Sequence, residues 1–314
     1  MSDSALQKIA AVKKNKSPQL ALRFCKLIKL PEELKELTWL TDLDLSWNKI
    51  EGVSILKQLP NLKVLKLDNN KIEDISALQG LTSLQVLDLS GNPIERISAL
   101  QHLTNLRSLD LSRTPKITSF QPLMNLVNLR VLSIRGNKVE NISMLEQLIE
   151  LRVLNLNDNE IEDISVLQYL KPLKRFSLDN NQIRHIEGLE MLTNLEYLSL
   201  QNNQIENVSA LQNLTKLRSL TLSHNQIKDL EGLQYLTNLT RLSLDNNLIE
   251  NIEHLVPLFR LNKMQIGPDV DFYFHTGEVS LRGNPLECPP IAIVRQGNKA
   301  IINYFEKVKN KRNI

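Results

Sequence analysis

The chain has 314 residues, of which 42% are apolar, 4% are aromatic and 23% are charged, and its net charge is +3. The apolar content is too high for a disordered chain, and glycine and proline are too scarce for a collagenous one. No apolar run approaches the roughly 18–20 residues that a membrane span needs. The charge is too small to indicate nucleic-acid binding, and two cysteines are too few for a disulfide framework or a metal site.

The first 39 residues are predicted to cap the amino-terminal end of the fold. Their lysine-rich start has no apolar segment of the kind found in secretory signals, so we expect a cytoplasmic protein. Residues 4–14 are predicted to form an amphipathic helix with Leu6, Ile9 and Ala10 facing inward. Residues 20–37 form a degenerate leading repeat, in which Cys25 is expected to be a small buried side chain.

One sequence unit then recurs through residues 40–260. Its first leucine falls at positions 40, 62, 84, 106, 129, 151, 173, 195, 217 and 239. Eight of the nine steps are 22 residues long, and one is 23 residues long. Ten near-identical units at one spacing are typical of a leucine-rich repeat solenoid.

The pattern within each unit predicts an α/β repeat fold. In L-x-x-L-x-L the leucines alternate as in a strand, and stacked strands bury their leucines in a shared core. We therefore expect a right-handed arc with one parallel sheet on its concave face and short 3₁₀ or helical segments on its convex face. Serines that precede the later apolar pair, such as Ser76, Ser165 and Ser209, resemble caps of those short segments.

An asparagine follows the first leucine by eight positions in almost every unit. A buried amide can donate twice and accept once, which satisfies backbone groups of its own coil and the next. The sequence therefore predicts a structural asparagine ladder, made of Asn48, Asn70, Asn92, Asn137, Asn159, Asn181, Asn203, Asn225, Asn247 and Asn284.

Residues 261–290 are predicted to be irregular final repeats. An eleventh strand is expected to start at residues 261–266, and Phe272, Tyr273 and Phe274 lie in the irregular stretch that follows. The array is expected to close on residues 279–286, and residues 291–314 are predicted to be a carboxy-terminal helix.

The unit, with its I-x-x-I-x-x-L-x-x-L tail, resembles the leucine-rich repeats of the protein phosphatase 1 regulatory subunit and of the internalins. The ends of the chain also resemble the leucine-rich region of bacterial Roco proteins, which are multidomain GTPases. That resemblance rests on residues 29–34 (KLPEEL) and 283–290 (GNPLECPP), and on residues 293–305, which are similar to the junction into the GTPase domain. No G-x-x-x-x-G-K-[ST] loop occurs, so GTPase activity is not implied. The chain is either a stand-alone relative or part of a larger GTPase.

The sequence predicts a protein-binding surface on the concave face. The position between the last two leucines is acidic in the first repeats and small and neutral later, up to Ser243 and Gln265. The position two residues earlier runs from acidic through aliphatic to basic, ending at Arg241 and Lys263. The candidate partner-binding residues are Asp44, Trp47, Lys66, Asp88, Asp110, Arg113, Arg135, Arg175, Tyr197, His224 and Arg241.

One repeat is irregular at residues 113–117. Threonine replaces the ladder asparagine there, and one residue is added before Ile117. Two interpretations stay open: a bulge that re-aims Arg113 toward a partner, or a tolerated insertion at the strand exit.

These patterns favour a non-enzymatic scaffold for an unidentified protein partner. The five histidines show no metal-ligand spacing, and no nucleophile or phosphate motif occurs, so we expect no catalytic residue, metal, cofactor or small-molecule substrate. Basic residues lack accompanying stacking rings, which argues against a nucleic-acid partner, and no membrane association is expected. The alternative function, from the repeat resemblance, is a regulatory subunit of a protein phosphatase.

Overall fold

The computed structural model describes residues 3–261, 263–266 and 278–312. The chain divides into two compact units, one made of residues 1–139 with 143–159 and the other of residues 140–142 with 160–314. Phe272, Tyr273 and Phe274 lie outside the described residues.

The first unit opens with helix α1 (Asp3–Asn15), which packs onto the first coil. Ala5 and Ile9 are buried and lie one helical turn apart, on the same face. Ala10 is exposed, so the prediction that it faces inward is wrong. Ala5 and Ile9 define the buried face of the helix. Ala10 lies outside this face, because it is about 100° around the helix from Ile9.

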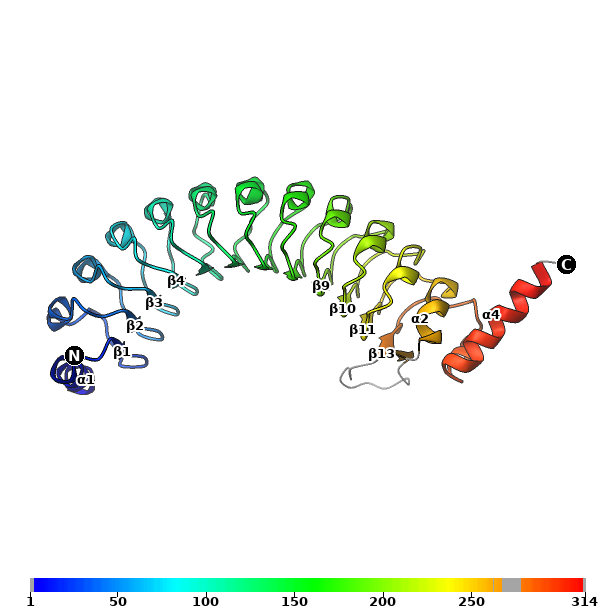
Figure 1. Ribbon diagram of the computed structural model, residues 1–314, viewed down its shortest axis with the longest axis horizontal. Helices are drawn as coiled ribbons and strands as arrows, with labels where there is room; N and C mark the ends of the chain where they lie inside the picture. The colour runs from blue at the N-terminus through cyan, green and yellow to red at the C-terminus, as the bar shows by residue number, and fades with distance from the viewer. Residues whose placement is uncertain (1–2, 262, 267–277, 313–314) are drawn as a thin grey trace. The chain divides into compact units, whose positions relative to one another are not determined.

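Seven short strands follow in the first unit, and each of the first six pairs in parallel with the next one along the chain (Figure 1). The register advances by one repeat, so that Leu43 lies opposite Leu65 and Leu65 opposite Leu87. The strands are β1 (Gln19–Ala21), β2 (Asp42–Asp44), β3 (Val64–Lys66), β4 (Val86–Asp88), β5 (Ser108–Asp110), β6 (Val131–Ser133) and β7 (Val153–Asn155).

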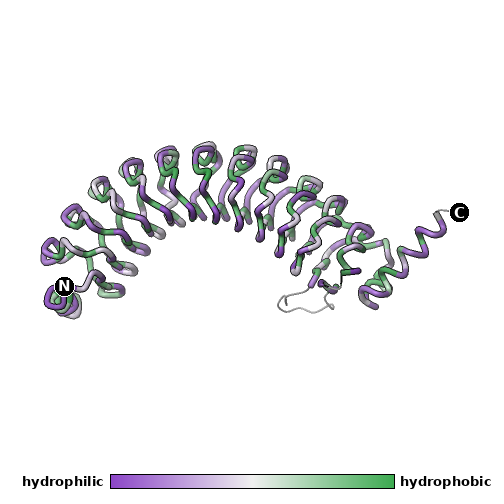
Figure 2. The backbone as a smooth tube through the Cα atoms, viewed as in Figure 1, coloured by the Kyte–Doolittle hydropathy of each residue, from purple (hydrophilic) through white to green (hydrophobic). Residues whose placement is uncertain are grey.

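Short 3₁₀ helices return the chain on the side away from the strands. In the first unit they are η1 (Glu32–Glu36), η2 (Ser54–Gln58), η3 (Ser76–Leu78), η4 (Ser98–His102), η5 (Gln121–Asn125) and η6 (Ser143–Gln147). Leucines and isoleucines from both sides are buried between the strands and the 3₁₀ helices. Figure 2 shows that apolar residues recur in every coil. The predicted leucine-rich repeat solenoid with a parallel sheet and 3₁₀ segments is therefore confirmed.

The second unit continues the same construction. Its strands are β8 (Arg175–Ser177), β9 (Tyr197–Ser199), β10 (Ser219–Thr221), β11 (Arg241–Ser243), β12 (Gln265–Ile266) and β13 (Glu278–Ser280). Its 3₁₀ helices are η7 (Ser165–Tyr169), η8 (Leu189–Met191), η9 (Ser209–Asn213), η10 (Leu233–Tyr235) and η11 (Glu253–Leu255).

The end of the sheet differs from the predicted order. Strand β13 pairs with β11, and β12 lies on the far side of β13. Ser280 and Glu278 therefore lie beside Ser243 and Arg241, in the places predicted for Gln265 and Lys263. The later segment carries a complete repeat motif ending in Asn284, whereas the unit that begins at Leu261 has Asp269 at the ladder position, eight residues on.

Three helices close the second unit. Helix α2 (Val256–Arg260) packs against α4 (Asn298–Arg312), and α4 also packs against α3 (Ile291–Val294). The segment predicted as one terminal helix is thus broken at Gly297, whose φ of +83° is left-handed. Ile301 and Phe305 of α4 are buried, as its apolar pattern predicts.

The 3₁₀ segments begin differently from the prediction. Ser76 and Ser165 do not use their hydroxyls as caps. Instead, the N–H of Ser76 donates to Asp74 Oδ1 at 2.8 Å, and the N–H of Ser165 donates to Asp163 Oδ1 at 2.8 Å. An Asp or Asn two residues earlier therefore forms an Asx turn that starts the segment. Asn207 does the same for Ser209.

Candidate functional site

Buried asparagines fasten each coil to its neighbour. In the first unit, Asn70 Nδ2 donates to the carbonyls of Leu45 (3.1 Å) and Leu67 (2.9 Å), and its Oδ1 accepts the N–H of Ile50 at 3.0 Å. Asn203 repeats these bonds in the second unit, with Leu178, Leu200 and Ile183. Because the amides are used up inside the molecule, they are not available to a partner.

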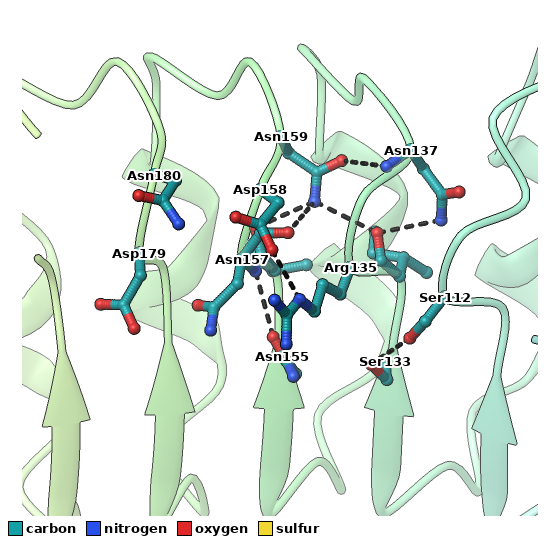
Figure 3. A network of polar contacts seen from close by, with 12 residues as sticks. Ser112, Ser133, Arg135, Asn137, Asn155, Asn157, Asp158, Asn159, Asp179 and Asn180 are labelled. Atoms are coloured by element: carbon teal, nitrogen blue, oxygen red, sulfur yellow. Dashed lines mark hydrogen bonds and ion pairs between the residues drawn. The ribbon is translucent and has the colours of Figure 1, made fainter. Parts of the chain in front are cut away.

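The ladder holds at the positions that the sequence assigns to it. Figure 3 shows Asn137 and Asn159, whose Nδ2 atoms both donate to the carbonyl of Ile134. Nine of the ladder asparagines are buried, and Asn284 is half-buried. The Asn284 side chain still donates to Leu244 and Leu281 and accepts from Ile249, so it carries the ladder into the coil of β13.

The residue just before each ladder position has a left-handed backbone. Its N–H donates to a carbonyl of the next coil, as Trp47 does to Asp68 (2.9 Å) and Arg113 to Arg135 (2.7 Å), so the turn is held in place. The φ angles are +57° at Trp47, +56° at Arg113 and +57° at His224. Other repeats place glycine, asparagine or aspartate here, the residues that adopt this conformation most readily.

Glycine or asparagine would therefore suit the left-handed backbone better than Trp47, Arg113 or His224 does. All three side chains are exposed. A side chain other than glycine in this conformation costs roughly 1–2 kcal/mol. Strained, exposed residues of this kind are concentrated at functional positions, so their placement favours a binding role for this row of the surface.

The first coils of the first unit expose two aromatic rings side by side. Phe24 and Trp47 have centroids 5.7 Å apart, and their side chains are 62% and 47% exposed. The guanidinium of Arg23 lies 4.9 Å from the Phe24 ring centroid. Exposed aromatic rings are the side chains that most often anchor a protein partner.

Phe24 was not among the residues predicted from the sequence. Its N–H donates to the carbonyl of Ser46, in the same way that Trp47 donates to Asp68. Phe24 therefore occupies, in the degenerate leading coil, the position that Trp47 occupies in the next. Extending the repeat lattice back past Cys25, which is buried as expected, would have found it.

Next to the rings, the sheet face of the first unit carries acidic side chains. Asp44, Lys66, Asp88 and Asp110 lie in register on adjacent strands β2 to β5. Each aspartate accepts the N–H two residues on, as Asp88 does from Ser90 at 3.0 Å. Burial raises the pKa of Asp88 above its ordinary value, and the charges of Asp110 and Asp68 add to this effect.

The two arginines of this face in the first unit lie in different surroundings. Arg135 Nε is 2.5 Å from Asp158 Oδ2, one coil further on (Figure 3). Arg113 is exposed, and its strand keeps the regular register: Ser108 lies opposite Val131 and Asp110 opposite Ser133. The added residue sits in the loop after the strand, so the backbone of Arg113 is not re-aimed by a bulge.

Thr114 takes over part of the asparagine's work in this irregular coil. It is fully buried, its N–H donates to Asn137 Oδ1 at 2.7 Å, and its hydroxyl donates to the carbonyl of Leu111 at 2.6 Å. A hydroxyl is shorter than an amide and makes fewer bonds, but it keeps the coil fastened. The geometry fits a tolerated insertion.

The second unit exposes a separate group of predicted residues on its own sheet face. The guanidinium of Arg175 lies 4.4 Å from the ring centroid of Tyr197, in a cation–π contact between β8 and β9. His224 lies 3.2 Å from the Asn246 amide, through its Nε2. Arg241 is exposed on β11, next to Glu278 of β13 in the sheet register.

The described residues contain no group of three or more His, Cys, Asp or Glu side chains that could hold a metal ion. Nor is any helix in the described ranges long and apolar enough to cross a membrane. What the two faces offer chemically is a set of exposed rings, carboxylates and guanidinium groups, each held on a rigid strand or turn.

The comparisons with known proteins agree with this architecture. Models described as leucine-rich repeats match residues 40–94, 82–123, 114–223 and 215–257. An internalin of Listeria monocytogenes is 32% identical with a TM-score of 0.82, and the match covers 90% of this chain and 82% of that one. The comparison with curated proteins gives no match.

Two further solved structures are similar. A leucine-rich repeat protein of Leptospira interrogans is 25% identical with a TM-score of 0.72, over 86% of this chain and 79% of that one. A plant peptide hormone receptor, solved in complex with RGF2, is 21% identical with a TM-score of 0.60, over 81% of this chain and 46% of that one; it shows likeness of fold alone. The chain belongs to the leucine-rich repeat proteins.

Proposed function

We propose that this protein is a non-enzymatic scaffold that binds a protein partner through the exposed face of its sheet. The observation that carries the proposal is the Phe24–Trp47 pair. In a chain with only 4% aromatic residues, two rings stand exposed beside a row of aspartates. Leaving rings in water is unfavourable, and burying them against a partner would recover that free energy.

The relatives support this proposal. Leucine-rich repeat proteins of this kind are protein-interaction scaffolds, and the plant receptor is one that is solved with its partner bound. In the present chain the leucines and asparagines that build the coil are buried, which leaves the strand residues between them free to vary. A partner would therefore be selected by the exposed rows, and the fold would be unaffected by their identity.

A site-specific photocrosslinker tests the proposal. It is placed at Lys66, exposed on the sheet face, and in a matched variant at Lys57, exposed at the end of η2 on the opposite side. We expect one discrete protein adduct from Lys66 in native cells and none from Lys57. Equal adducts from both positions, or none from Lys66, would overturn the proposal.

Two finer assignments are part of the proposal. The KLPEEL and GNPLECPP segments resemble the borders of the Roco leucine-rich region, which favours a role as a signalling module beside a GTPase in the cytoplasm. A reading frame that continues into a G-x-x-x-x-G-K-[ST] loop would support this. Recovery of a phosphatase catalytic subunit as the Lys66 adduct would instead support the regulatory-subunit alternative, which rests on the repeat class.

A further inference from the structure

A row of arginines runs along one edge of the sheet in the first unit, away from the residues discussed above. Arg107, Arg130 and Arg152 each follow the first leucine of their coil, in three consecutive coils. The N–H of Arg130 donates to the carbonyl of Arg107 at 2.8 Å, and that of Arg152 to the carbonyl of Arg130 at 2.9 Å. Their backbones are therefore adjacent rungs, about 4.8 Å apart.

These three guanidinium groups are exposed, and none forms an ion pair with any residue that the structure describes. The second unit provides a contrast at the same repeat position. There Lys174 is followed one coil later by Glu196, and the two are paired at 3.3 Å. The first unit thus stacks three like charges where the second alternates charge, although like charges on adjacent rungs repel one another.

Exposed aliphatic side chains accompany the arginines. Two residues before the first leucine, six other coils have threonine, at positions 38, 82, 104, 193, 215 and 237. The coils that carry Arg130 and Arg152 have Val127 and Ile149 instead, which are 45% and 53% exposed. Each lies in the turn that leads into the strand, closed by the N–H of Leu129 or Leu151.

We call Arg107, Arg130, Arg152, Val127 and Ile149 the arginine edge. Unpaired like charge and exposed aliphatic surface are each unfavourable for the free protein, and they occur together in neighbouring coils. Arginine beside apolar surface is the composition of a binding hot spot. Glu150, next to Ile149, is exposed and forms no ion pair with the three arginines, so the edge is most positive toward Arg107.

The spacing of the rungs decides the form of the ligand. Three rungs span about 9.6 Å at 4.8 Å each. Residues i, i+4 and i+7 on one face of an α-helix span about 10.5 Å at 1.5 Å per residue, whereas alternate residues of an extended strand span about 13.6 Å. Carboxylates at helical spacing therefore meet the three arginines one to one, in the bidentate geometry that arginine favours.

We propose that the arginine edge is a second docking surface, which binds an acidic amphipathic helix of a partner protein. Asp or Glu side chains at i, i+4 and i+7 of that helix would face Arg107, Arg130 and Arg152. Leucine or isoleucine side chains on the adjoining stripe would cover Val127 and Ile149. This surface is separate from the sheet face, and its test does not depend on a partner bound there.

The test uses a defined probe: a labelled 20-residue helical peptide with Glu at i, i+4 and i+7 and leucines on the neighbouring stripe. Its binding to the full chain is measured by fluorescence anisotropy. We expect saturable binding that weakens at least about tenfold in the triple variant Arg107→Gln, Arg130→Gln, Arg152→Gln, since charge-assisted bonds are lost. Ile149→Thr, which restores the common repeat residue, is expected to weaken binding about threefold to tenfold.

Matched controls separate this proposal from others. Lys174→Gln, at the same repeat position in the second unit, and Trp47→Asn, on the sheet face, are expected to leave peptide binding unchanged. The same peptide with a central proline, which breaks the helix, is expected to bind at least about tenfold more weakly. Equal binding of the triple variant, or of the proline peptide, would overturn the proposal. Tighter binding of a single-stranded oligonucleotide through the same arginines would also overturn it, in favour of nucleic acid.

Discussion

Two neighbouring positions of the repeat behave in opposite ways. The ladder position is asparagine in nearly every coil, buried, and bonded to two carbonyls and one N–H. The position just before it is exposed or half-exposed in every described coil and holds residues as different as Trp47, Gly91, Arg113 and His224. Both have fixed backbones, so the difference lies in what the side chain does.

Two adjacent residues therefore have different tasks: the buried side chain stabilises the fold, and the exposed one is available to a partner. The buried side chain satisfies backbone groups that no water can reach, so only an amide, or the hydroxyl of Thr114, fits. The exposed side chain has no such task, and tryptophan, arginine or histidine there replaces a residue better suited to the left-handed backbone.

Removing a ladder amide should have the largest effect. Asn203→Ala leaves the N–H of Ile183 without its partner. The carbonyls of Leu178 and Leu200 each lose one of two amide bonds, because they still accept from Asn181 and Asn225. We expect the free energy of unfolding in urea to fall by about 2–4 kcal/mol, from one buried N–H left unsatisfied and from the bonds lost at the two carbonyls.

The matched control is Asn194→Ala, a half-exposed asparagine whose side chain donates to the carbonyl of Lys171 and accepts from Lys216 Nζ, both at the surface. Its expected loss is below about 1 kcal/mol. Similar losses from Asn203→Ala and Asn194→Ala would mean that burial of the amide is not what matters.

Exchanging residues at the left-handed position should have intermediate effects of opposite sign. Arg113→Gly removes the strain of a side chain at φ +56° and is expected to raise the free energy of unfolding by about 0.5–1 kcal/mol. Gly91→Arg, at φ +67°, places a Cβ 2.9 Å from Asn69 Oδ1 and is expected to lower it by about 1–2 kcal/mol. Equilibrium urea unfolding measures both, and effects of the same sign would refute the strain account.

The smallest effect should depend on pH. The raised pKa of Asp88 means that its charged form is disfavoured by folding, so this aspartate lowers stability above its folded pKa. Asp88→Asn is expected to raise the Tm at neutral pH, and the gain should vanish as the pH falls through the raised pKa of Asp88. Asn155 already accepts the N–H of Asn157 in this way, so the bond survives the change.

Asp163 supplies the opposite case. The Ser165 N–H lowers its pKa, so its charged form is favoured by folding and Asp163→Asn should lower the Tm at neutral pH. That loss should disappear as the pH falls through the ordinary aspartate range toward the lowered pKa. Calorimetric Tm curves of both variants against pH check the two signs, and parallel curves would contradict them.

Because the repeat spacing is regular, the buried residues of each coil could be predicted from the sequence. Each leucine and ladder asparagine is fixed by a local task that recurs at one spacing, so its burial and bonds follow from its position. The prediction was wrong where the lattice breaks. Residues 261–266 read as the next strand, but β13 lies beside β11 because it brings the complete motif with Asn284.

The exposed surface was less predictable from the sequence. The unit of Trp47 was recognised, but the degenerate leading coil hid Phe24 at the equivalent position. The arginine edge was missed because its residues lie outside the strand positions that were compared. The backbone bonds between rungs show that Arg107, Arg130 and Arg152 are neighbours, and the structure gives none of them an ion-pair partner among the residues that it describes.

Trp47→Asn and Asn48→Ala, compared in the Lys66 photocrosslinking assay and in urea unfolding, test whether two adjacent residues carry recognition and stability separately. Asparagine is the residue that other coils place at the position of Trp47, so the first variant should unfold at the same or a higher urea concentration. We expect Trp47→Asn to lose the partner adduct at full stability, and Asn48→Ala to lose stability. A Trp47→Asn protein that keeps its adduct undiminished would contradict this expectation.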